Sequence, residues 1–235
     1  MSAAPLLQVL RLGRTRYEDA HQMQRELLEQ RIAGAIGDHL LLTEHEPVVT
    51  VGRGASATDL SGLDLPVVAV ERGGEATYHG PGQVVGYPIL ALAQGRRDLR
   101  RYLRDLEEVV LRVLAEFDVE GTRRPGLTGV WIGARKVASV GVAVRRWVTW
   151  HGFALNVHTD LAAFGGFEPC GLDPAVMTRL ADHAELPPGN LLVEVLVVKH
   201  FCAVFGLRLP PASASGARGP DAGGPSLPTL PILPS

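Results

Sequence analysis

The sequence predicts an α+β protein in which helices flank a largely antiparallel sheet. Helical and strand-like patterns mix along the chain without the regular strand–helix–strand alternation that is typical of parallel sheets. The segment 129–161 is rich in β-branched and aromatic residues, and turns expected at 133–135 and 145–146 divide it into consecutive strands. The 235 residues are enough for one large domain or two small ones.

Strands dominate the first part of the chain. Residues 16–34 are the exception, because their apolar side chains recur every three or four positions and so predict a helix. Strands are predicted for four segments rich in apolar and β-branched residues: 6–13, 38–54, 65–74 and 83–92. The second of these is expected to be two short strands that separate at Glu46-Pro47.

Two longer helices are predicted in the second part of the chain. Residues 96–117 place their apolar side chains on one stripe, and residues 190–207 form a second, strongly apolar helix. Proline, glycine and serine dominate after Leu209 and no apolar periodicity remains. We therefore expect a folded domain at 1–209 and a disordered tail at 210–235.

Composition excludes several classes of function. The net charge of -2 gives no overall cationic field for binding a nucleic acid. No apolar run approaches the roughly 20 residues that a membrane-spanning helix needs. The N-terminus lacks the pattern of a signal peptide, and two cysteines make a disulfide framework a poor expectation. We expect a cytoplasmic protein that does not interact with membranes.

The segment 71–88 is the densest collection of functional residue types. It holds five glycines together with Arg72, Thr77 and His79. Glycines let the backbone approach a ligand closely, and such a loop can direct several N–H groups at one oxygen. The segment matches neither phosphate-binding glycine pattern. The alternative is a wide turn between two strands.

Cys170 lies between Pro169 and Gly171, just ahead of a predicted short helix at 173–183. Asp173 is expected as its N-cap, so the thiol would lie near the positive end of a helix dipole, which favours thiolate. The alternative is a buried, inert cysteine.

Lysine is unusually rare. Of the 23 basic residues only Lys136 and Lys199 are lysine. A lysine amine can lose its proton whereas a guanidinium cannot, so Lys136, at a strand start, is a candidate for acid–base work. His151-Gly152 interrupts another predicted strand, and a glycine there indicates a close approach by a ligand or by backbone.

These segments together resemble one known family, the lipoyl(octanoyl) transferases. The resemblance is carried by RGGEATYHGPGQ (72–83), RKVASVGV (135–142), RRWVTWHGFALNV (145–157) and PCGL (169–172). The upstream LLLTEHEPVVTVGR (40–53) is also similar to that family's pattern, and the resemblance extends from about residue 8 to residue 207. It implies a fold similar to the catalytic domain of biotin and lipoate protein ligases, and makes 1–209 an octanoyltransferase catalytic domain.

The resemblance also implies a reaction. An octanoyl group would move from octanoyl-acyl carrier protein to a lysine of lipoyl domains, on 2-oxoacid dehydrogenase complexes and the glycine cleavage H protein, in protein lipoylation. It would pass through an acyl-thioester on Cys170, whose ionised form Lys136 would favour, with His151 as a possible assisting residue and no cofactor or metal. The implied substrate-binding residues are Arg72, Gly73, Gly74, Glu75, Ala76, Thr77, Tyr78, His79, Ser139, Val140, Gly141, Gly152, Phe153 and Ala154.

Three alternatives stay open. An ATP-dependent lipoate or biotin-type protein ligase would activate the acyl group as an adenylate and need no catalytic cysteine. A cysteine thioesterase would need a Cys–His pair, which Cys170 with His79 or His151 could supply. A binding module without catalysis would bind the carrier even when Cys170 is replaced.

Overall fold

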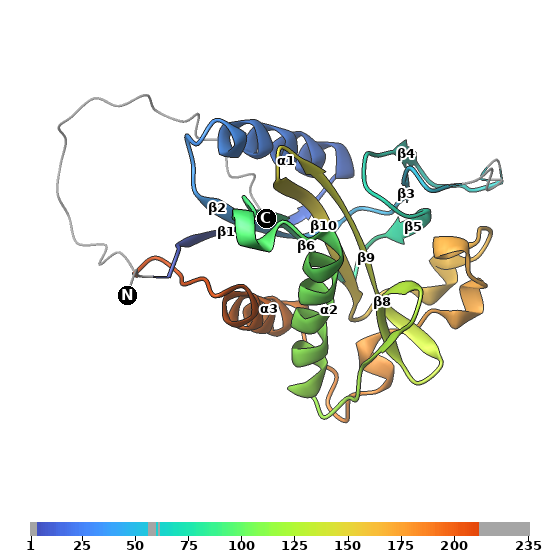
Figure 1. Cartoon of the computed structure of the whole chain (residues 1–235). Helices are drawn as coiled ribbons and strands as arrows, with labels where there is room; N and C mark the ends of the chain where they lie inside the picture. The colour runs from blue at the N-terminus through green and yellow to red at the C-terminus, as the bar shows by residue number, and fades with distance from the viewer. Residues whose placement is uncertain (1–3, 56–59, 61, 212–235) are drawn as a thin grey trace, which may run out of the picture.

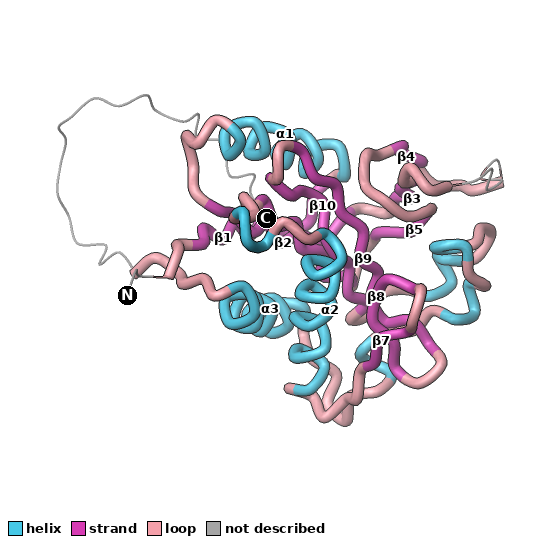
Figure 2. The backbone as a smooth tube through the Cα atoms, in the orientation of Figure 1, coloured by secondary structure: helices cyan, strands magenta, loops and turns pink. Residues whose placement is uncertain are grey.

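The computed structural model describes residues 4–55, 60 and 62–211 (Figure 1). The predicted tail at 210–235 lies outside the described residues from 212 onward. The predicted α+β class is confirmed: a large, mostly antiparallel sheet lies between helices, and a small sheet extends from one side of it (Figure 2).

The main sheet has seven strands in the order β1-β2-β6-β10-β9-β8-β7. Their bounds are β1 Leu7–Thr15, β2 Asp38–His45, β6 Gln83–Ile89, β10 Val148–Asn156, β9 Arg135–Arg145, β8 Leu127–Ile132 and β7 Thr122–Arg124. Only β1 and β2 pair in parallel. Every residue of the neighbouring strands β6 and β10 is buried, because helices cover both faces there. The turn between β9 and β10 falls at Arg146-Trp147, one residue later than predicted.

A second, three-stranded sheet has the order β4-β3-β5, with β4 Val67–Ala69, β3 Val48–Val51 and β5 Ala76–His79. The sequence did not predict β5, which lies inside the glycine-rich segment and pairs antiparallel with β3. Ala76 and Tyr78 point into an apolar cluster with Phe164, whereas Thr77 and His79 point the other way. Strand β5 has only four residues and two of them are polar, so its alternation of apolar and polar residues is too short to recognise in the sequence. The short β7 was not predicted either.

Helices cover the two faces of the main sheet (Figure 1). Helix α1, Tyr17–Ile32, packs on one face through Ala20 and Leu28, whereas α2, Leu99–Ala115, and α3, Asn190–Phe205, pack on the other. Helix α2 starts three residues later than predicted, because the Asp98 carboxylate accepts a hydrogen bond from the Arg101 amide (3.1 Å) and so caps it. No helix in the described ranges has the length and apolar character to cross a membrane.

The predicted helix at 173–183 is wrong. The segment forms two three-residue 3-10 turns, Pro174–Val176 and Leu180–Asp182. Asp173 does cap the first turn, by accepting from the Ala175 amide at 2.8 Å. The backbone between the turns is diverted to the main sheet, where the Thr178 amide donates to the Lys136 carbonyl at 2.9 Å. Because the Thr178 amide donates to the main sheet, it cannot also donate to the carbonyl four residues earlier, as a helix would require.

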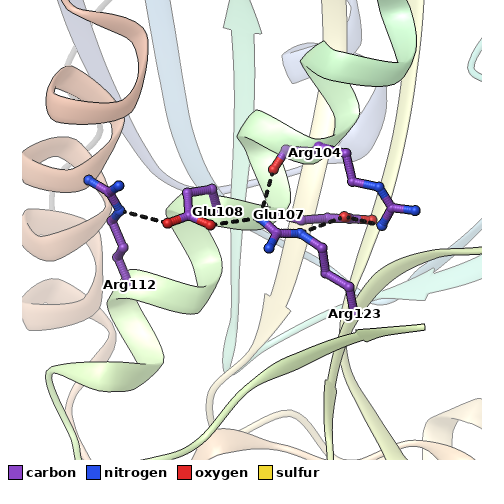
Figure 3. A network of polar contacts seen from close by, with 5 residues as sticks. All are labelled: Arg104, Glu107, Glu108, Arg112 and Arg123. Atoms are coloured by element: carbon purple, nitrogen blue, oxygen red, sulfur yellow. Dashed lines mark hydrogen bonds and ion pairs between the residues drawn. The ribbon is translucent and has the colours of Figure 1, made fainter. Parts of the chain in front are cut away.

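Glu107 joins α2 to the β7–β8 hairpin through a buried carboxylate (Figure 3). It accepts from Arg104 at 2.7 Å, from Arg123 at 3.2 Å and from the Gly129 amide at 2.9 Å. The neighbouring Glu108 is half-exposed and accepts from Arg112 and Arg123. Both carboxylates therefore bind arginine, but only Glu107 does so out of contact with water.

We expect Glu107→Ala to lower the free energy of unfolding by about 3 kcal/mol, because it leaves a buried amide and two guanidinium groups without their shared acceptor. The matched variant Glu108→Ala should cost about 1 kcal/mol or less, since its ion pairs are solvated. Chemical denaturation of the three proteins measures both. Equal losses in the two variants would contradict this ranking.

His45 is a buried link between β2 and β6. Its Nε2 lies 2.7 Å from the Tyr87 hydroxyl, and burial lowers the pKa of His45 from 6.5 to about 4. The unfolded chain therefore binds a proton on this residue below about pH 6.5, where the folded chain does not. The free energy of unfolding must fall as the pH falls through this window.

His45→Gln should flatten that dependence. Between pH 4.5 and 6 the slope of unfolding free energy against pH should be smaller in the variant than in the wild type, by up to about 1.4 kcal/mol per pH unit. Denaturant titrations at several pH values measure the slope. Parallel curves for the two proteins would show that His45 does not stay neutral in the folded state.

Candidate active site

A cavity of about 330 Å³ lies between the glycine-rich segment, β9, β10 and the first turns of α2. Most of the predicted site residues line it: Arg72, Gly73, Gly74, Glu75, Thr77, His79, Lys136, Ser139, Val140, Gly141, His151, Gly152, Phe153, Ala154 and Cys170. The two exceptions are Ala76 and Tyr78, which lie on the opposite side of β5 and pack in the small apolar cluster. The sequence pattern could not separate them because it did not predict a strand there.

Cys170 reaches the cavity from a 3-10 turn at Pro169–Gly171. Its φ is +56°, a left-handed conformation that non-glycine residues rarely adopt. The next residue, Gly171, has a φ of +67°, which is also left-handed and favours glycine. The Cys170 Sγ is half-buried and lies 3.6 Å from the Ser139 Oγ of β9. The turn and the main sheet thus meet at the thiol.

In the described segment directly after Cys170, no helix dipole points its positive end at this thiol, but two basic side chains share its cavity. A three-residue 3-10 turn follows Cys170, so the predicted helix dipole is absent. Lys136 and Arg72 line the same cavity and are both buried, with exposed fractions of 3% and 8%. Two basic side chains therefore line the cavity together with the Cys170 thiol.

A bulge in β9 presents Lys136 to the cavity. Val130 of β8 pairs with Ala138 and Trp131 pairs with Lys136, so β9 carries one extra residue, Val137. Bulges re-aim neighbouring side chains, and here one brings Lys136 to the cavity that Ser139 also lines. The side chain passes so close over Gly129 that a Cβ there would meet its Cε at 2.8 Å.

Lys136 contrasts with the other lysine. Its Nζ lies 5.9 Å from the centroid of the Trp131 ring, and no carboxylate of the described residues lies within 4.0 Å of it. Lys199 is exposed and pairs with Glu116 at 2.6 Å. Of the two lysines, Lys136 is thus the buried one, and no carboxylate of the described residues pairs with it.

Arg72 is held by neutral acceptors. Its Nη1 donates to the carbonyls of Gly73 and Glu75, and its Nη2 donates to the carbonyl and hydroxyl oxygens of Thr50. Burial lowers the pKa of Arg72, and negative charge on Cys170 opposes that shift. A thiolate at Cys170 would therefore stabilise the charged guanidinium of Arg72.

The two histidines of the cavity are neutral. Burial lowers the pKa of His79 to about 3 and that of His151 to about 2. The ring nitrogens of His79 contact Gln83 (2.8 Å) and Thr50 (3.3 Å). Among the described residues, Ser139 is the hydrogen-bond partner of Cys170. The Cys–His pair that a cysteine thioesterase needs is therefore not assembled.

One group of side chains has the composition of a metal site. Ligand atoms of His21, Glu71 and His151 lie within 4.8 Å of one another. The His21 Nε2 already contacts the Glu71 carboxylate at 3.0 Å, while the His151 Nε2 is 3.8 Å from it. The positive charges of Arg72 and Arg53 help to lower the pKa of His151, and that field would also oppose a divalent cation. This cluster does not fit a resident metal.

Sequence reasoning missed several residues of the site. The cavity is also lined by Tyr17, Val85, Tyr87, Leu99, Leu103, Gly126, Leu127, Thr128, Val142 and Leu172. Most of these are apolar or aromatic side chains that the sequence cannot distinguish from core residues. The polar residues Thr50, Gln83 and Asn156 are also buried, although they belong to strands β3, β6 and β10 that consist mostly of apolar residues.

The comparisons with known proteins agree with this geometry. Residues 16–202 match the family model described as "Lipoyl protein ligase A/B catalytic domain". A curated octanoyltransferase of a Nostoc species is 49% identical over 200 residues, which cover 82% of this chain and 89% of that protein. The octanoyltransferase of Syntrophotalea carbinolica is 44% identical and is covered to 99% of its length, with 89% of this chain aligned.

Solved structures support the fold. A putative lipoate protein ligase from T. acidophilum with bound lipoic acid superposes with a TM-score of 0.68 at 15% identity, over 87% of this chain and 88% of that one. A biotin protein ligase from Aquifex aeolicus in complex with biotin and ATP gives a TM-score of 0.52 at 13% identity, over 86% and 70%. The predicted similarity to the biotin and lipoate ligase fold is confirmed. The chain belongs to the lipoyl protein ligase A/B catalytic domain family.

Proposed function

We propose that this protein is an octanoyltransferase that moves an octanoyl group from octanoyl-acyl carrier protein to a lysine of a lipoyl domain, through an acyl-thioester on Cys170. The observation that carries the proposal is the meeting of Cys170, Lys136 and Arg72 at one cavity. The relatives named octanoyltransferase, at 44% to 49% identity, support the same reaction class. The catalytic domain is assigned to residues 1–209.

The first step exchanges one thioester for another. The Cys170 sulfur, as thiolate, attacks the octanoyl carbonyl carbon, and the bond from that carbon to the carrier's phosphopantetheine sulfur breaks. The leaving sulfur takes up the proton that Cys170 gave up, with Lys136 carrying it between them. The basic side chains of Lys136 and Arg72 line the same cavity as this sulfur, where they can stabilise negative charge that develops during the exchange.

The second step forms the amide. The free ε-amine of the acceptor lysine attacks the acyl carbonyl, a C–N bond forms, and the bond to the Cys170 sulfur breaks. The amine loses one proton, which Lys136 accepts and returns to the cysteine thiolate. The enzyme is thereby restored to its starting state. Both steps develop negative charge on the carbonyl oxygen, which donors around the cavity stabilise.

The cavity suits the acyl chain. Apolar side chains line it, among them Val85, Leu103, Val140 and Phe153. At about 0.8 kcal/mol for each buried CH₂, an octanoyl chain contributes roughly 5 kcal/mol of binding free energy. Gly141 lets the segment that carries Arg72 pack closely on β9 at the cavity wall, because a Cβ there would meet the Gly73 carbonyl at 3.0 Å and the Arg72 Cδ at 3.2 Å.

The partners follow from this chemistry. The donor is octanoyl-acyl carrier protein, and the acceptors are lipoyl domains of 2-oxoacid dehydrogenase complexes and the H protein of glycine cleavage. The acyl donor is already a thioester, so transfer proceeds without ATP, a metal or another cofactor. We assign the reaction to the cytoplasm, where protein lipoylation would use a carrier-bound acyl group.

Incubation with octanoyl-acyl carrier protein, without ATP or acceptor, should add the mass of one octanoyl group to the protein. Cys170→Ser should not acquire this mass, because the oxygen at that position is a far weaker nucleophile at neutral pH. Cys202→Ser is the matched control and should be acylated normally. Intact-mass spectrometry reads all three proteins, and acylation only in the presence of ATP would indicate an adenylating ligase instead.

Lys136→Arg should reduce octanoyl transfer at least about 100-fold, because a guanidinium keeps the charge but cannot carry the proton. Lys199→Arg, which makes the same replacement at an exposed ion pair, should leave transfer unchanged. Single-turnover transfer and thermal unfolding are measured on both variants. Near-normal transfer by a folded Lys136→Arg protein would refute the role of a deprotonatable amine.

A further inference from the structure

A run of buried hydrogen bonds starts at Arg72 and passes through four strands, β3, β5, β6 and β10. Its members outside the cavity are Thr50 of β3, Gln83 of β6 and Asn156 of β10, all buried. None of these three side chains lines the cavity, and no role is assigned to them by the proposed mechanism. A row of buried polar groups is costly unless every member is satisfied, so its presence needs a reason.

Two backbone carbonyls fix the direction of every bond in the run. The Asn156 Nδ2 donates to the Thr178 carbonyl at 2.9 Å, so the Asn156 Oδ1 faces Gln83 and accepts from its Nε2 at 2.9 Å. The Gln83 Nε2 also lies 3.2 Å from the Tyr78 carbonyl, which leaves the Gln83 Oε1 as an acceptor toward His79. Both amide orientations therefore follow from acceptor-only groups.

The same logic sets the tautomer of His79. Its Nδ1 lies 2.8 Å from the Gln83 Oε1, so Nδ1 carries the hydrogen and Nε2 accepts. The Thr50 hydroxyl, 3.3 Å from that Nε2, is the donor. The Thr50 oxygen in turn accepts from the Arg72 Nη2 at 2.8 Å. From the Arg72 guanidinium to the Thr178 carbonyl, each hydrogen bond of the run therefore has one donor and one acceptor.

The far end of the run lies at Lys136. The amide of Thr178 donates to the Lys136 carbonyl at 2.9 Å, and Met177 forms a bridge with Lys136. One end of the run thus holds the Arg72 side chain, and the other end holds strand β9, which carries Lys136.

We propose that Thr50, Gln83 and Asn156 are positioning residues, whose directed run of hydrogen bonds holds Arg72 and Lys136 in a fixed relation around the cavity that Cys170 also lines. This inference rests on the proposed octanoyl transfer. It adds three residues that act on the reaction through Arg72 and Lys136. Loss of the Thr50 hydroxyl leaves Arg72 with one acceptor fewer and leaves the buried His79 Nε2 without a donor. The guanidinium can then move away from the thiol while the fold is kept by its remaining bonds.

The test compares Thr50→Val, Thr50→Ser and Thr149→Val. Thr149 is equally buried and its hydroxyl bonds to Tyr102, the Leu90 amide and the Pro88 carbonyl, away from the cavity. We expect Thr50→Val to slow single-turnover acylation of Cys170 by octanoyl-acyl carrier protein roughly tenfold or more, with little change in the carrier KM. Thr50→Ser should recover most of the rate. Thr149→Val should lower the melting temperature and keep a near-normal rate.

A second readout does not depend on activity. In the wild-type protein the ¹⁵N spectrum of His79 should show a neutral ring protonated on Nδ1 from pH 5 to 9. A ring protonated on Nε2, or one that titrates in that range, would overturn the inference. Equal acylation rates in Thr50→Val and wild type would overturn the positioning role alone, whereas absence of acylation in the wild type would overturn the proposed function and this role together.

Discussion

The cavity holds two buried basic side chains, Arg72 and Lys136. Among the described residues, no carboxylate pairs with either of them. A buried charge without a counter-charge is costly, so the protein compensates each one differently. Backbone carbonyls and the Thr50 oxygens surround the guanidinium, while the Lys136 ammonium lies near the Trp131 ring face. In the proposed mechanism the thiolate of Cys170 is the charge that both of them lack.

Much of the architecture serves this arrangement. The small sheet positions Thr50 and the carbonyls that bind Arg72, and the bulge in β9 turns Lys136 toward the same space. Cys170 comes from a loop, which the packing of Phe164, Phe167 and Met177 against Ala76 and Tyr78 anchors to the small sheet. Strand β9 thus carries Lys136, the loop between β4 and β5 carries Arg72, and a turn with a left-handed residue carries the nucleophile.

The sequence was informative where one local rule decided the structure. The apolar stripe from Leu103 to Val113 predicted α2, and alternation with turn residues predicted the consecutive strands β8, β9 and β10. The scarcity of lysine pointed to Lys136, and the flanking proline and glycine pointed to Cys170. These two residues do line one cavity, as the family resemblance implies.

Sequence reasoning failed where distant contacts decided the structure. The helix expected at 173–183 is replaced by turns, because the Thr178 amide bonds to strand β9. Strand β5 exists through its pairing with β3, which no local pattern announces, and its alternation sends Ala76 and Tyr78 away from the cavity. Gln83 and Asn156 are far apart in the chain, so their hydrogen bond appears only when β6 and β10 pair.

The rate at which iodoacetamide alkylates Cys170 at pH 6.5 reports whether Lys136 and Arg72 together keep this thiol reactive. Cys202, whose pKa is raised by burial, is the slow internal reference in the same molecule. We expect Cys170 to react much faster than Cys202 in the wild type. Lys136→Met and Arg72→Met should each slow the alkylation of Cys170 and leave that of Cys202 unchanged. Equal rates for Cys170 in the wild type and in both folded variants would contradict this expectation.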